Sequence, residues 1–433
     1  MRIAVWHNLP SGGGKRALYD HVRGLVARGH TVETWAPPSA DRSYLPLEEL
    51  ALGHIVPWDR PLVSEAGFLG WSLNPSRRAV AELDAAEHHA RRCAEEINRG
   101  GFDVVFANTC QYLFSPDIAR HVDPPTVLYL QEPCRSLYEA MPWDQEGSKL
   151  PWIALSPAPR RRASPAEWKR RLTASVRDFS EVRALRERAR RELINARACR
   201  KILCNSLFSR ESIKRAYGLE SEVSYLGVDT IAFEPALTSK EPFVVGLGSM
   251  SHHKGLDLAI QAVSRIEPHS RPRLVWIGNA TSEDYLSDMN LLASTLGVEF
   301  VPRVLVSHVE LTETLSQAAA LVYTSRLEPF GFAPLEANAC GTVAVAMAEG
   351  GIRETVSDGV NGDLVAPGDI GAVARALEKY TGNLSLARKA GLRAREHVVS
   401  AWSVVSACDR LEQHLIEGGG PCVGQVLLPG QRV

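Results

Sequence analysis

Two carboxylates in the second half of the chain are spaced to form one ligand site. Glu328 and Glu336 are separated by seven residues in the segment LEPFGFAPLEANACG (327–341). We expect Glu328 in the loop after a strand and Glu336 near the start of the next helix, behind Pro334. Glu336 would accept two hydrogen bonds from a ribose diol, while Glu328 would face the reacting group. Gly331, between them, would let backbone amides approach the ligand closely.

Two loops carry groups suited to binding a diphosphate. In GSMSHHKG (248–255), Lys254 stands at the beginning of a predicted helix, where its charge adds to the positive end of the helix dipole. In LPSGGGKRAL (9–18), three consecutive glycines present unhindered N–H groups beside a helix N-terminus, which makes an anion site. We therefore predict Lys254 and Glu328 as catalytic residues and include the glycines in the donor site: Gly12, Gly13 and Gly14.

The same glycines permit a second interpretation. GGGKRA fits G-x-G-x-x-A, the fingerprint of dinucleotide-binding folds, with Glu33 about twenty residues further on as a ribose ligand. Against this, the segment HNLPS separates Trp6 from Gly12, whereas the first glycine of the fingerprint normally ends the strand. A Walker A loop is excluded, because Leu9 occupies its first glycine position. An NAD-dependent oxidoreductase stays open as an alternative of another class.

Composition is that of a globular protein with no global attraction to nucleic acid. The 433 residues are 45% hydrophobic and 23% charged, and the net charge is −1. No apolar segment approaches the roughly 18 residues of a spanning helix. Eight cysteines without a CxxC pair, and no signal sequence, lead us to expect a cytoplasmic protein. Because no His, Asp or Cys cluster has metal-ligand spacing, we expect neither a metal nor a cofactor.

The order of elements predicts two α/β domains. Short β-branched segments alternate with helical patterns, which is typical of parallel sheets covered by helices. The first domain would span 1–228 and the second 240–395, with a ligand held between the carboxyl ends of both sheets. A last helix within 401–417 would pack back on the first domain, and 418–433 would form a loose tail. Strands in the first domain are expected over 2–6, 31–36, 103–107 and 126–130, and its first helix over 17–29.

A long basic helix is predicted over 168–197. Its apolar positions step by three or four from Leu172 to Ala196, and residues 160–201 hold 15 basic and 5 acidic side chains. A membrane-surface helix and a solvated helix both have this composition. We expect the first domain to cover the narrow apolar stripe, which favours a soluble acceptor over a lipid-linked one. The loop before the helix, around Trp143–Trp152, is a candidate lid.

These motifs resemble the retaining family-4 glycosyltransferases of GT-B fold, and the likeness extends over most of the chain. The 327–341 segment resembles their signature, and GSMSHHKG their G-R-x-x-x-x-K-G donor loop. LPSGGGKRAL resembles their N-terminal glycine-rich loop, and LYLQEPCRSLYE (128–139) the segment that approaches the reaction centre. Residues 203–229 resemble the stretch that leads into the interdomain linker, and residues 350–365 the region after the signature.

The resemblance implies further site residues and two departures. Ser249 stands where the family carries an arginine, so Lys254 would bind the diphosphate with help from Arg16, Lys15 or backbone amides. Gln131 stands where many members carry histidine, and an amide cannot take up a proton. The reaction centre or acceptor site would contain Gln131 and Glu132. The implied donor-binding residues beyond the glycines are Arg16, Ser249, Lys254, Phe330, Gly331, Phe332 and Glu336.

The expected activity is therefore a retaining, metal-independent, hexosyltransferase-like reaction. It would move a sugar from a nucleoside-diphosphate sugar to a small soluble acceptor, in specialised-metabolite or glycoconjugate biosynthesis. A membrane-surface enzyme with a lipid-linked acceptor, the oxidoreductase above and a non-catalytic nucleotide-sugar sensor are the alternatives. A retaining glycosidase is disfavoured, because it would leave the phosphate-binding loops unexplained. The base, the sugar, the acceptor and the oligomeric state do not follow from the sequence.

Overall fold

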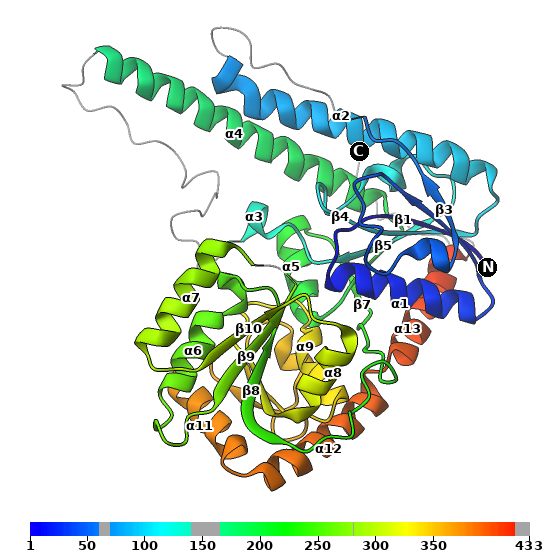
Figure 1. The fold of residues 1–433 in the computed structure, drawn as a ribbon. Coiled ribbons are helices and arrows are strands. Elements are labelled where there is room, and N and C mark those ends of the chain that lie inside the picture. The colour runs from blue at the N-terminus through cyan, green and yellow to red at the C-terminus, as the bar shows by residue number, and fades with distance from the viewer. Residues whose placement is uncertain (60–69, 140–164, 280, 421–433) are drawn as a thin grey trace.

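A computed structural model describes residues 1–59, 70–139, 165–279 and 281–420, which form two domains, each built on one sheet (Figure 1). The first sheet has the strand order β3-β2-β1-β4-β5-β6-β7 and the second the order β10-β9-β8-β11-β12-β13. Neighbouring strands pair in parallel throughout the described part of both sheets. The predicted α/β fold with two Rossmann-like domains is confirmed.

The strands of the first domain are β1 (Arg2–Asn8), β2 (Thr31–Ala36), β3 (Leu52–Ile55), β4 (Val104–Cys110), β5 (Thr126–Gln131), β6 (Lys201–Cys204) and β7 (Glu222–Val223). Its helices are α1 (Gly13–Ala27), α2 (Gly70–Arg99), α3 (Arg135–Tyr138), α4 (Pro165–Ala198) and α5 (Leu207–Tyr217).

The strands of the second domain are β8 (Glu241–Leu247), β9 (Arg273–Gly278), β10 (Phe300–Val304), β11 (Ala318–Tyr323), β12 (Ala344–Met347) and β13 (Gly362–Val365). Its helices are α6 (Leu256–Ser264), α7 (Glu283–Thr295), α8 (His308–Gln317), α9 (Phe332–Ala339), α10 (Ile352–Thr355), α11 (Ile370–Thr381) and α12 (Leu384–Ala401). The last helix is α13 (Val404–Gly419).

Central strands are buried along their whole length in both sheets. β4 reads VVFANTC and β11 reads AAALVY, and every residue of each is buried. Helices cover both faces of a parallel sheet, so such strands are continuously apolar instead of alternating. Several helices begin at a serine whose hydroxyl accepts a backbone N–H three residues later: Ser206, Ser282 and Ser307.

The strand order reverses beside β1 in the first sheet and beside β8 in the second. At such a point the loops that follow the two neighbouring strands diverge and leave a crevice at the carboxyl edge of the sheet. The loop after β8 carries Lys254, the loop after β11 carries Glu328, and the loop after β1 leads into the glycine triplet 12–14. The topology therefore places the three predicted motifs at carboxyl edges.

The first helix begins earlier than the predicted range of 17–29. Gly13 and Gly14 form the first turn of α1, and Gly12 caps it with a φ of 137°. This backbone angle is open to glycine, which lacks Cβ. The N–H groups of a first turn have no partner inside their own helix, so they are available to other groups.

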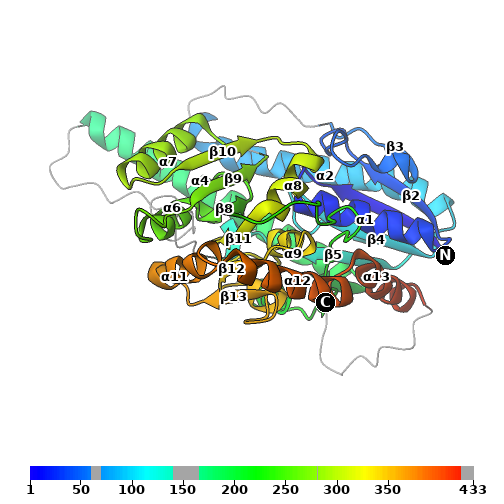
Figure 2. The same ribbon diagram turned by 60° about the horizontal axis from the view of Figure 1, so that its bottom comes forward.

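Helices α2 and α4 lie side by side along the first domain (Figure 1, Figure 2). The amide of Ser76 donates to Ser180 Oγ at 3.0 Å between them. The prediction that the first domain covers the apolar stripe of α4 is wrong for its first half, because the side chains of Leu172 and Phe179 are 64% and 68% exposed. The apolar positions recur at less than the 3.6 residues of a helical turn, so the stripe winds around the helix.

The chain crosses back to the first domain at its last helix. α12 packs on the second domain, and α13 packs on α1, β4 and β5 (Figure 2). Between the two helices, Val228 and Ser403 form a parallel β-bridge. The helices α1 and α13 approach closely at Gly24, where a Cβ atom would lie 2.2 Å from Cys408 Sγ.

The candidate lid at Trp143–Trp152 and most of the predicted tail, residues 421–433, lie outside the described residues. Among the described helices, none has the length and apolarity needed to cross a membrane.

Candidate active site

A cleft of about 470 Å³ lies between the two domains at the carboxyl edges of both sheets. Its lining comes from the beginning of α1, the segments after β5, β6, β8 and β11, and the beginning of α9. The lining residues are Gly13, Gly14, Gln131, Glu132, Arg135, Asn205, Leu226, His253, Lys254, Arg326, Glu328, Pro329, Phe330, Gly331 and Phe332. Most of the predicted site residues are thus in one cavity.

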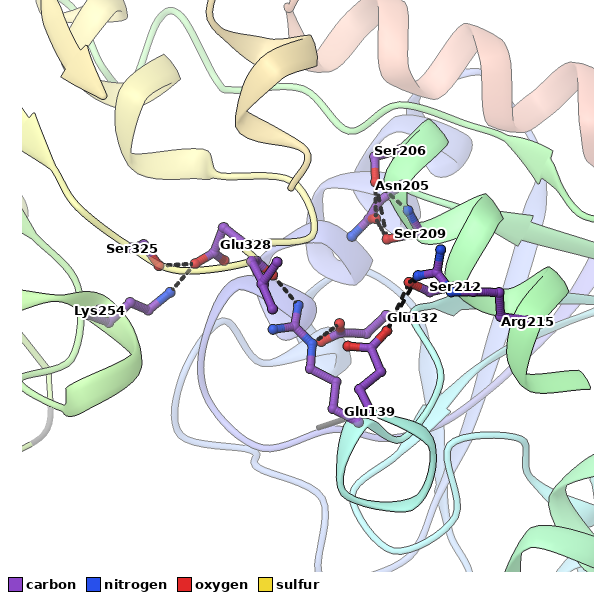
Figure 3. Close-up of polar contacts among 12 residues, drawn as sticks. Glu132, Glu139, Asn205, Ser206, Ser209, Ser212, Arg215, Lys254, Ser325 and Glu328 are labelled. Carbon is purple, nitrogen blue, oxygen red and sulfur yellow. Dashed lines mark hydrogen bonds and ion pairs between the residues drawn. The ribbon is translucent and has the colours of Figure 1, made fainter. Parts of the chain in front are cut away.

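The two predicted catalytic residues are bonded to each other. Lys254 Nζ donates to Glu328 Oε2 at 2.6 Å, and Ser325 Oγ donates to the same oxygen at 2.7 Å (Figure 3). Burial alone would raise the pKa of Glu328, but Lys254, Ser325 and Arg135 outweigh it and lower this pKa to about 2. An ammonium group and an ionised carboxylate therefore face the cleft together at neutral pH.

A second carboxylate stands across the cleft from Glu328. Arg135 Nε donates to Glu132 Oε2 at 2.6 Å, and the other end of the guanidinium donates to the backbone oxygen of Leu327 at 2.5 Å. Burial raises the pKa of Glu132 to about 7, against the opposing charge of Arg135 and with a further rise from Glu328. Arg135 thus ties the first domain to the loop that holds Glu328.

The backbone at Gln131 is held in an uncommon conformation. Its φ is 63°, and the amide of Glu132 donates to the carbonyl of Leu130 at 2.8 Å, which closes a γ-turn of the rare positive-φ kind. Such strain is concentrated at functional sites. The turn brings the Gln131 side chain beside α1, where a methyl group on Gly14 would lie 3.3 Å from Gln131 Nε2. Gln131 and Glu132 therefore both reach the cleft.

Glu336 is 4% exposed and ion-paired to Arg16 of the first domain. Arg16 also contacts Tyr44. The Tyr44 hydroxyl oxygen accepts hydrogen bonds from Arg16 Nε at 3.1 Å and from Arg16 Nη2 at 2.9 Å. The sequence assigns Glu336 and Arg16 to different parts of one donor. In the structure they bind each other across the interface between the domains.

Glycines support the loop that carries Glu328. A Cβ atom on Gly350 would lie 2.4 Å from the backbone oxygen of Glu328, and one on Gly351 would lie 2.1 Å from the backbone oxygen of Pro329. The amide of Gly351 donates to the Glu328 carbonyl at 2.7 Å. Gly331 caps α9 with a φ of 88°, and a Cβ there would collide with Ile352. The segment after the signature therefore fixes the backbone of the signature itself.

Four predicted donor residues are not among those that line the cleft: Gly12, Arg16, Ser249 and Glu336. Ser249 lines a neighbouring cavity of about 480 Å³, together with Tyr285 and other residues of the 281–288 segment. Phe330 lines the cleft, but its ring is buried and packs on Phe332 and Trp402, with ring centroids 5.2 and 5.8 Å away. A ligand in the cleft would therefore meet mainly the backbone of Phe330.

Several residues that line the cleft were not among the predicted site residues. They include Arg135, Asn205, His253 and Arg326. The local signal for Arg135 was its position three residues after Glu132, which suits an ion pair in a turn of helix. The contact between Arg135 and Leu327 joins residues 192 positions apart, so no local sequence pattern predicts it.

Glu33, the alternative ribose ligand, lies away from the cleft. It is the third residue of β2, and its carboxylate bonds His54 Nε2 at 2.9 Å and Arg2 at 3.2 Å. In a dinucleotide-binding fold the acidic residue stands at the carboxyl end of its strand, beside the ligand. The geometry therefore argues against the oxidoreductase alternative.

One group among the described residues has the spacing of a metal site: Glu222, His414 and Glu417. The ammonium of Lys201 lies between its two carboxylates, at 3.1 and 2.8 Å. None of these residues lines the cleft.

Two family models cover almost the whole chain. "Glycosyltransferase Family 4" matches residues 11–231, and "Glycosyl transferases group 1" matches residues 228–397. The glycogen synthase of Mycobacterium tuberculosis H37Rv is 32% identical over 164 residues, which are 37% of this chain and 39% of that protein. D-inositol 3-phosphate glycosyltransferase 1 of Catenulispora acidiphila is 29% identical over 51% of this chain and 59% of its own length. The chain thus spans only part of the curated relatives that it matches.

Solved structures of the same fold cover nearly the full chain. Sucrose-phosphate synthase from Thermosynechococcus elongatus superposes with a TM-score of 0.66 at 16% identity, over 96% of this chain and 98% of that one. Anabaena HepE in complex with UDP-glucose gives 0.64 at 17% identity, over 96% and 100%. At this identity the likeness establishes the arrangement of two domains about a cleft.

Proposed function

Since the chain belongs to Glycosyltransferase Family 4, we propose that it moves a sugar from a nucleoside-diphosphate donor to an acceptor molecule, with retention at the anomeric carbon. The observation that carries the proposal is the cleft, into which Lys254, Glu328 and the N-terminus of α1 converge from both domains. A cation, a helix N-terminus and a carboxylate are the groups that a sugar diphosphate requires around its reacting bond.

In the proposed complex, Lys254 and the first amides of α1 bind the diphosphate. The negative charge that develops on the leaving phosphate would be stabilised by these groups without a metal ion. Glu336 would exchange Arg16 for the hydroxyl groups of the ribose. Glu328 would contact the sugar. Its carboxylate, which also accepts a hydrogen bond from Ser325, would accept hydrogen bonds from the sugar hydroxyl groups.

The acceptor is proposed to enter from the first domain, beside Gln131 and Glu132. The acceptor proton would pass to the departing phosphate or to Glu132, since the amide of Gln131 takes up none. A small soluble acceptor is the expectation from the sequence. The exposed apolar residues of α4 favour a second candidate, an acceptor presented at a membrane surface.

A nucleotide panel tests the donor class. UDP, GDP, ADP, TDP and NAD would be titrated against the wild type and Lys254→Ala in a thermal-shift experiment, with Lys389→Ala, exposed on α12, as matched control. We test UDP first, because the neighbour HepE has been crystallised with UDP-glucose. One diphosphate should raise the melting temperature of the wild type and the control, but less that of Lys254→Ala. A response to NAD alone would contradict the proposal.

Transfer itself would then be measured with the matching nucleotide sugar in EDTA. We expect activity to persist. Activity lost in EDTA and restored by magnesium or manganese would contradict the metal-independent part of the proposal and leave the donor class intact.

A further inference from the structure

One face of α4 is exposed along the whole described helix. In its first part the exposed side chains are large and apolar: Trp168 is 47% exposed, Leu172 64% and Phe179 68%. These residues recur at intervals of four and seven, so they lie on one side of the helix. Both views place the first turns of α4 at the outer edge of the molecule (Figure 1, Figure 2). Three exposed bulky apolar side chains on one face mark an interaction surface.

Arginines continue the same face toward the end of the helix. They follow Phe179 at intervals of three, four and seven, and all are exposed: Arg183, Arg186, Arg190 and Arg197. One acidic residue of the helix, Glu187, borders this face and lines a hollow beside α2 together with Arg190. In the described part of the chain, none of the four arginines makes an ion pair.

Arginines on other sides of α4 are partnered. Arg188 bonds Glu192 at 3.3 Å within the helix. Arg191 bonds both Glu87 and Asp117 of neighbouring segments, the former at 2.5 Å and the latter at 3.1 Å. Among the described side chains of α4, the arginines without an ion pair therefore lie on the outer face, beside the exposed apolar residues.

We propose that this outer face of α4, defined by residues 168, 172, 179, 183, 186, 190 and 197, docks on an anionic lipid bilayer. Aromatic and aliphatic side chains would enter the interface of the bilayer while the arginines contact the phosphate and carboxylate groups of the headgroups. A second copy of this chain would bring the same four arginines to the contact, which opposes self-association. An uncharged apolar partner would leave the arginines without counter-charges.

The docked helix is connected to the cleft through the chain. α4 joins β5, which ends at Gln131, to β6, which is followed by Asn205, and both of these residues line the cleft. If the proposed function holds, docking would bring a lipid-linked acceptor to the first-domain side of the cleft. Docking itself does not require that the chain transfers a sugar.

Sedimentation with vesicles tests the surface. The full chain would be mixed with vesicles of phosphatidylcholine containing about a third phosphatidylglycerol, and with vesicles of phosphatidylcholine alone. The wild type should sediment with the anionic vesicles, less so at high salt, and weakly with the neutral ones. Leu172→Ser with Phe179→Ser should lower the partition coefficient at least about tenfold, because two bulky apolar side chains no longer enter the bilayer. Each of Arg183→Gln, Arg186→Gln and Arg190→Gln should lower it about fivefold.

Matched controls separate docking from general surface effects. Leu291→Ser removes an exposed leucine of α7, and Arg388→Gln with Arg393→Gln removes exposed arginines of α12. These variants should sediment like the wild type, and every variant should keep its nucleotide-induced thermal shift, which reports folding. Failure of the wild type to sediment with anionic vesicles at low salt would overturn the proposal. So would a dimer in solution that Phe179→Ser dissociates, because a second copy would then cover the face. A missing nucleotide response with intact sedimentation would contradict the proposed function alone.

Discussion

Lys254 and Glu328 form an ion pair in the cleft, and the proposed donor would compete for Lys254. Lys254→Ala would leave Glu328 partly buried, with Ser325 as its remaining close donor. We expect turnover at saturating donor to fall about 10²- to 10³-fold, because the lost charge acts most on the leaving phosphate in the transition state. Acceptor affinity should change little. Steady-state kinetics of Lys254→Ala, with Lys389→Ala as control, tests this expectation. Wild-type turnover in Lys254→Ala would show that another cation stabilises the leaving phosphate.

Glu336 is the buried carboxylate that should recognise the ribose. Glu336→Ala removes an acceptor of charged hydrogen bonds worth roughly 1.5–3 kcal/mol, so calorimetric affinity for the nucleoside diphosphate should fall at least about tenfold. Glu299→Ala, an exposed glutamate before β10, serves as control. Equal affinity of the wild type and Glu336→Ala would remove the ribose role and leave Glu336 as the partner of Arg16.

If Glu132 takes the acceptor proton, as proposed, we expect the reaction to depend on pH near neutrality. Its pKa is raised to about 7 by burial and by Glu328, with Arg135 opposing. A proton acceptor must be ionised, so kcat/KM should rise with pH through about 7 and then level off. Glu132→Gln should lower kcat/KM roughly 10²-fold and remove this rise. A Glu132→Gln profile with the wild-type rise would assign the titration elsewhere, for example to the phosphate.

At this scale the sequence predicts residue types better than partners. The motif spacing placed Lys254, Glu328 and two of the three glycines, Gly13 and Gly14, in one cleft, because loops after neighbouring parallel strands leave the sheet at the same edge. It did not predict that Arg16 would form an ion pair with Glu336, or that Arg135 would donate a hydrogen bond to the backbone oxygen of Leu327. These contacts depend on how two domains face each other, which no local pattern encodes.

The loop between β11 and α9 owes its shape to the turn at Gly350 and Gly351. A Cβ on Gly351 would meet a backbone oxygen, which cannot move aside as a side chain can. Gly351→Ala should therefore displace Glu328 and weaken nucleotide binding at least about tenfold, with a stability loss of about 1–3 kcal/mol. Gly371→Ala in helix α11 is the control, since alanine there should be neutral or stabilising by roughly 0.5–1 kcal/mol. Calorimetry and thermal unfolding measure both, and unchanged binding in Gly351→Ala would contradict the supporting role.

Elements with a strong local signal were predicted with nearly correct bounds, and weakly patterned ones were not. The strand expected over 31–36 is β2 itself, and the helix expected over 168–197 is α4 within a few residues. Helix α2 was not identified, because its inner face is largely alanine, as at Ala86, Ala90 and Ala94, and contrasts little with its surroundings. In α4 the existence of the helix was predictable, but the direction of its stripe depended on a small mismatch with the helical period.

In the whole molecule, the two domains are joined twice. The linker after β7 and the segment between α12 and α13 run side by side at Val228 and Ser403. Glu354 of the second domain accepts from the amides of Leu207 and Phe208 at 2.7 and 3.0 Å, at the N-terminus of α5 in the first. The domains are therefore held by two chain connections and by the contacts of Glu354.

The close crossing of α1 and α13 should control the second connection. Gly24→Val would force side-chain atoms into Cys408 Sγ, which lies 2.2 Å from the position of a Cβ. We expect a loss of about 1–3 kcal/mol in unfolding free energy and faster hydrogen exchange over 404–419. Gly420→Ala, with only ordinary contacts, is the control. Wild-type exchange rates in Gly24→Val would show that α13 is held elsewhere.

The return of α13 also sets an order of events during synthesis. Helix α13 covers a surface formed by α1, β4 and β5. The residues of that surface have all been synthesised once β5 is made, but α13 is synthesised only after the entire second domain. At the usual rates of roughly 5–20 residues per second, a ribosome needs on the order of tens of seconds to reach it. During that interval the nascent first domain carries an open apolar surface, the kind that chaperones bind, while the second domain already has all the residues of its own sheet.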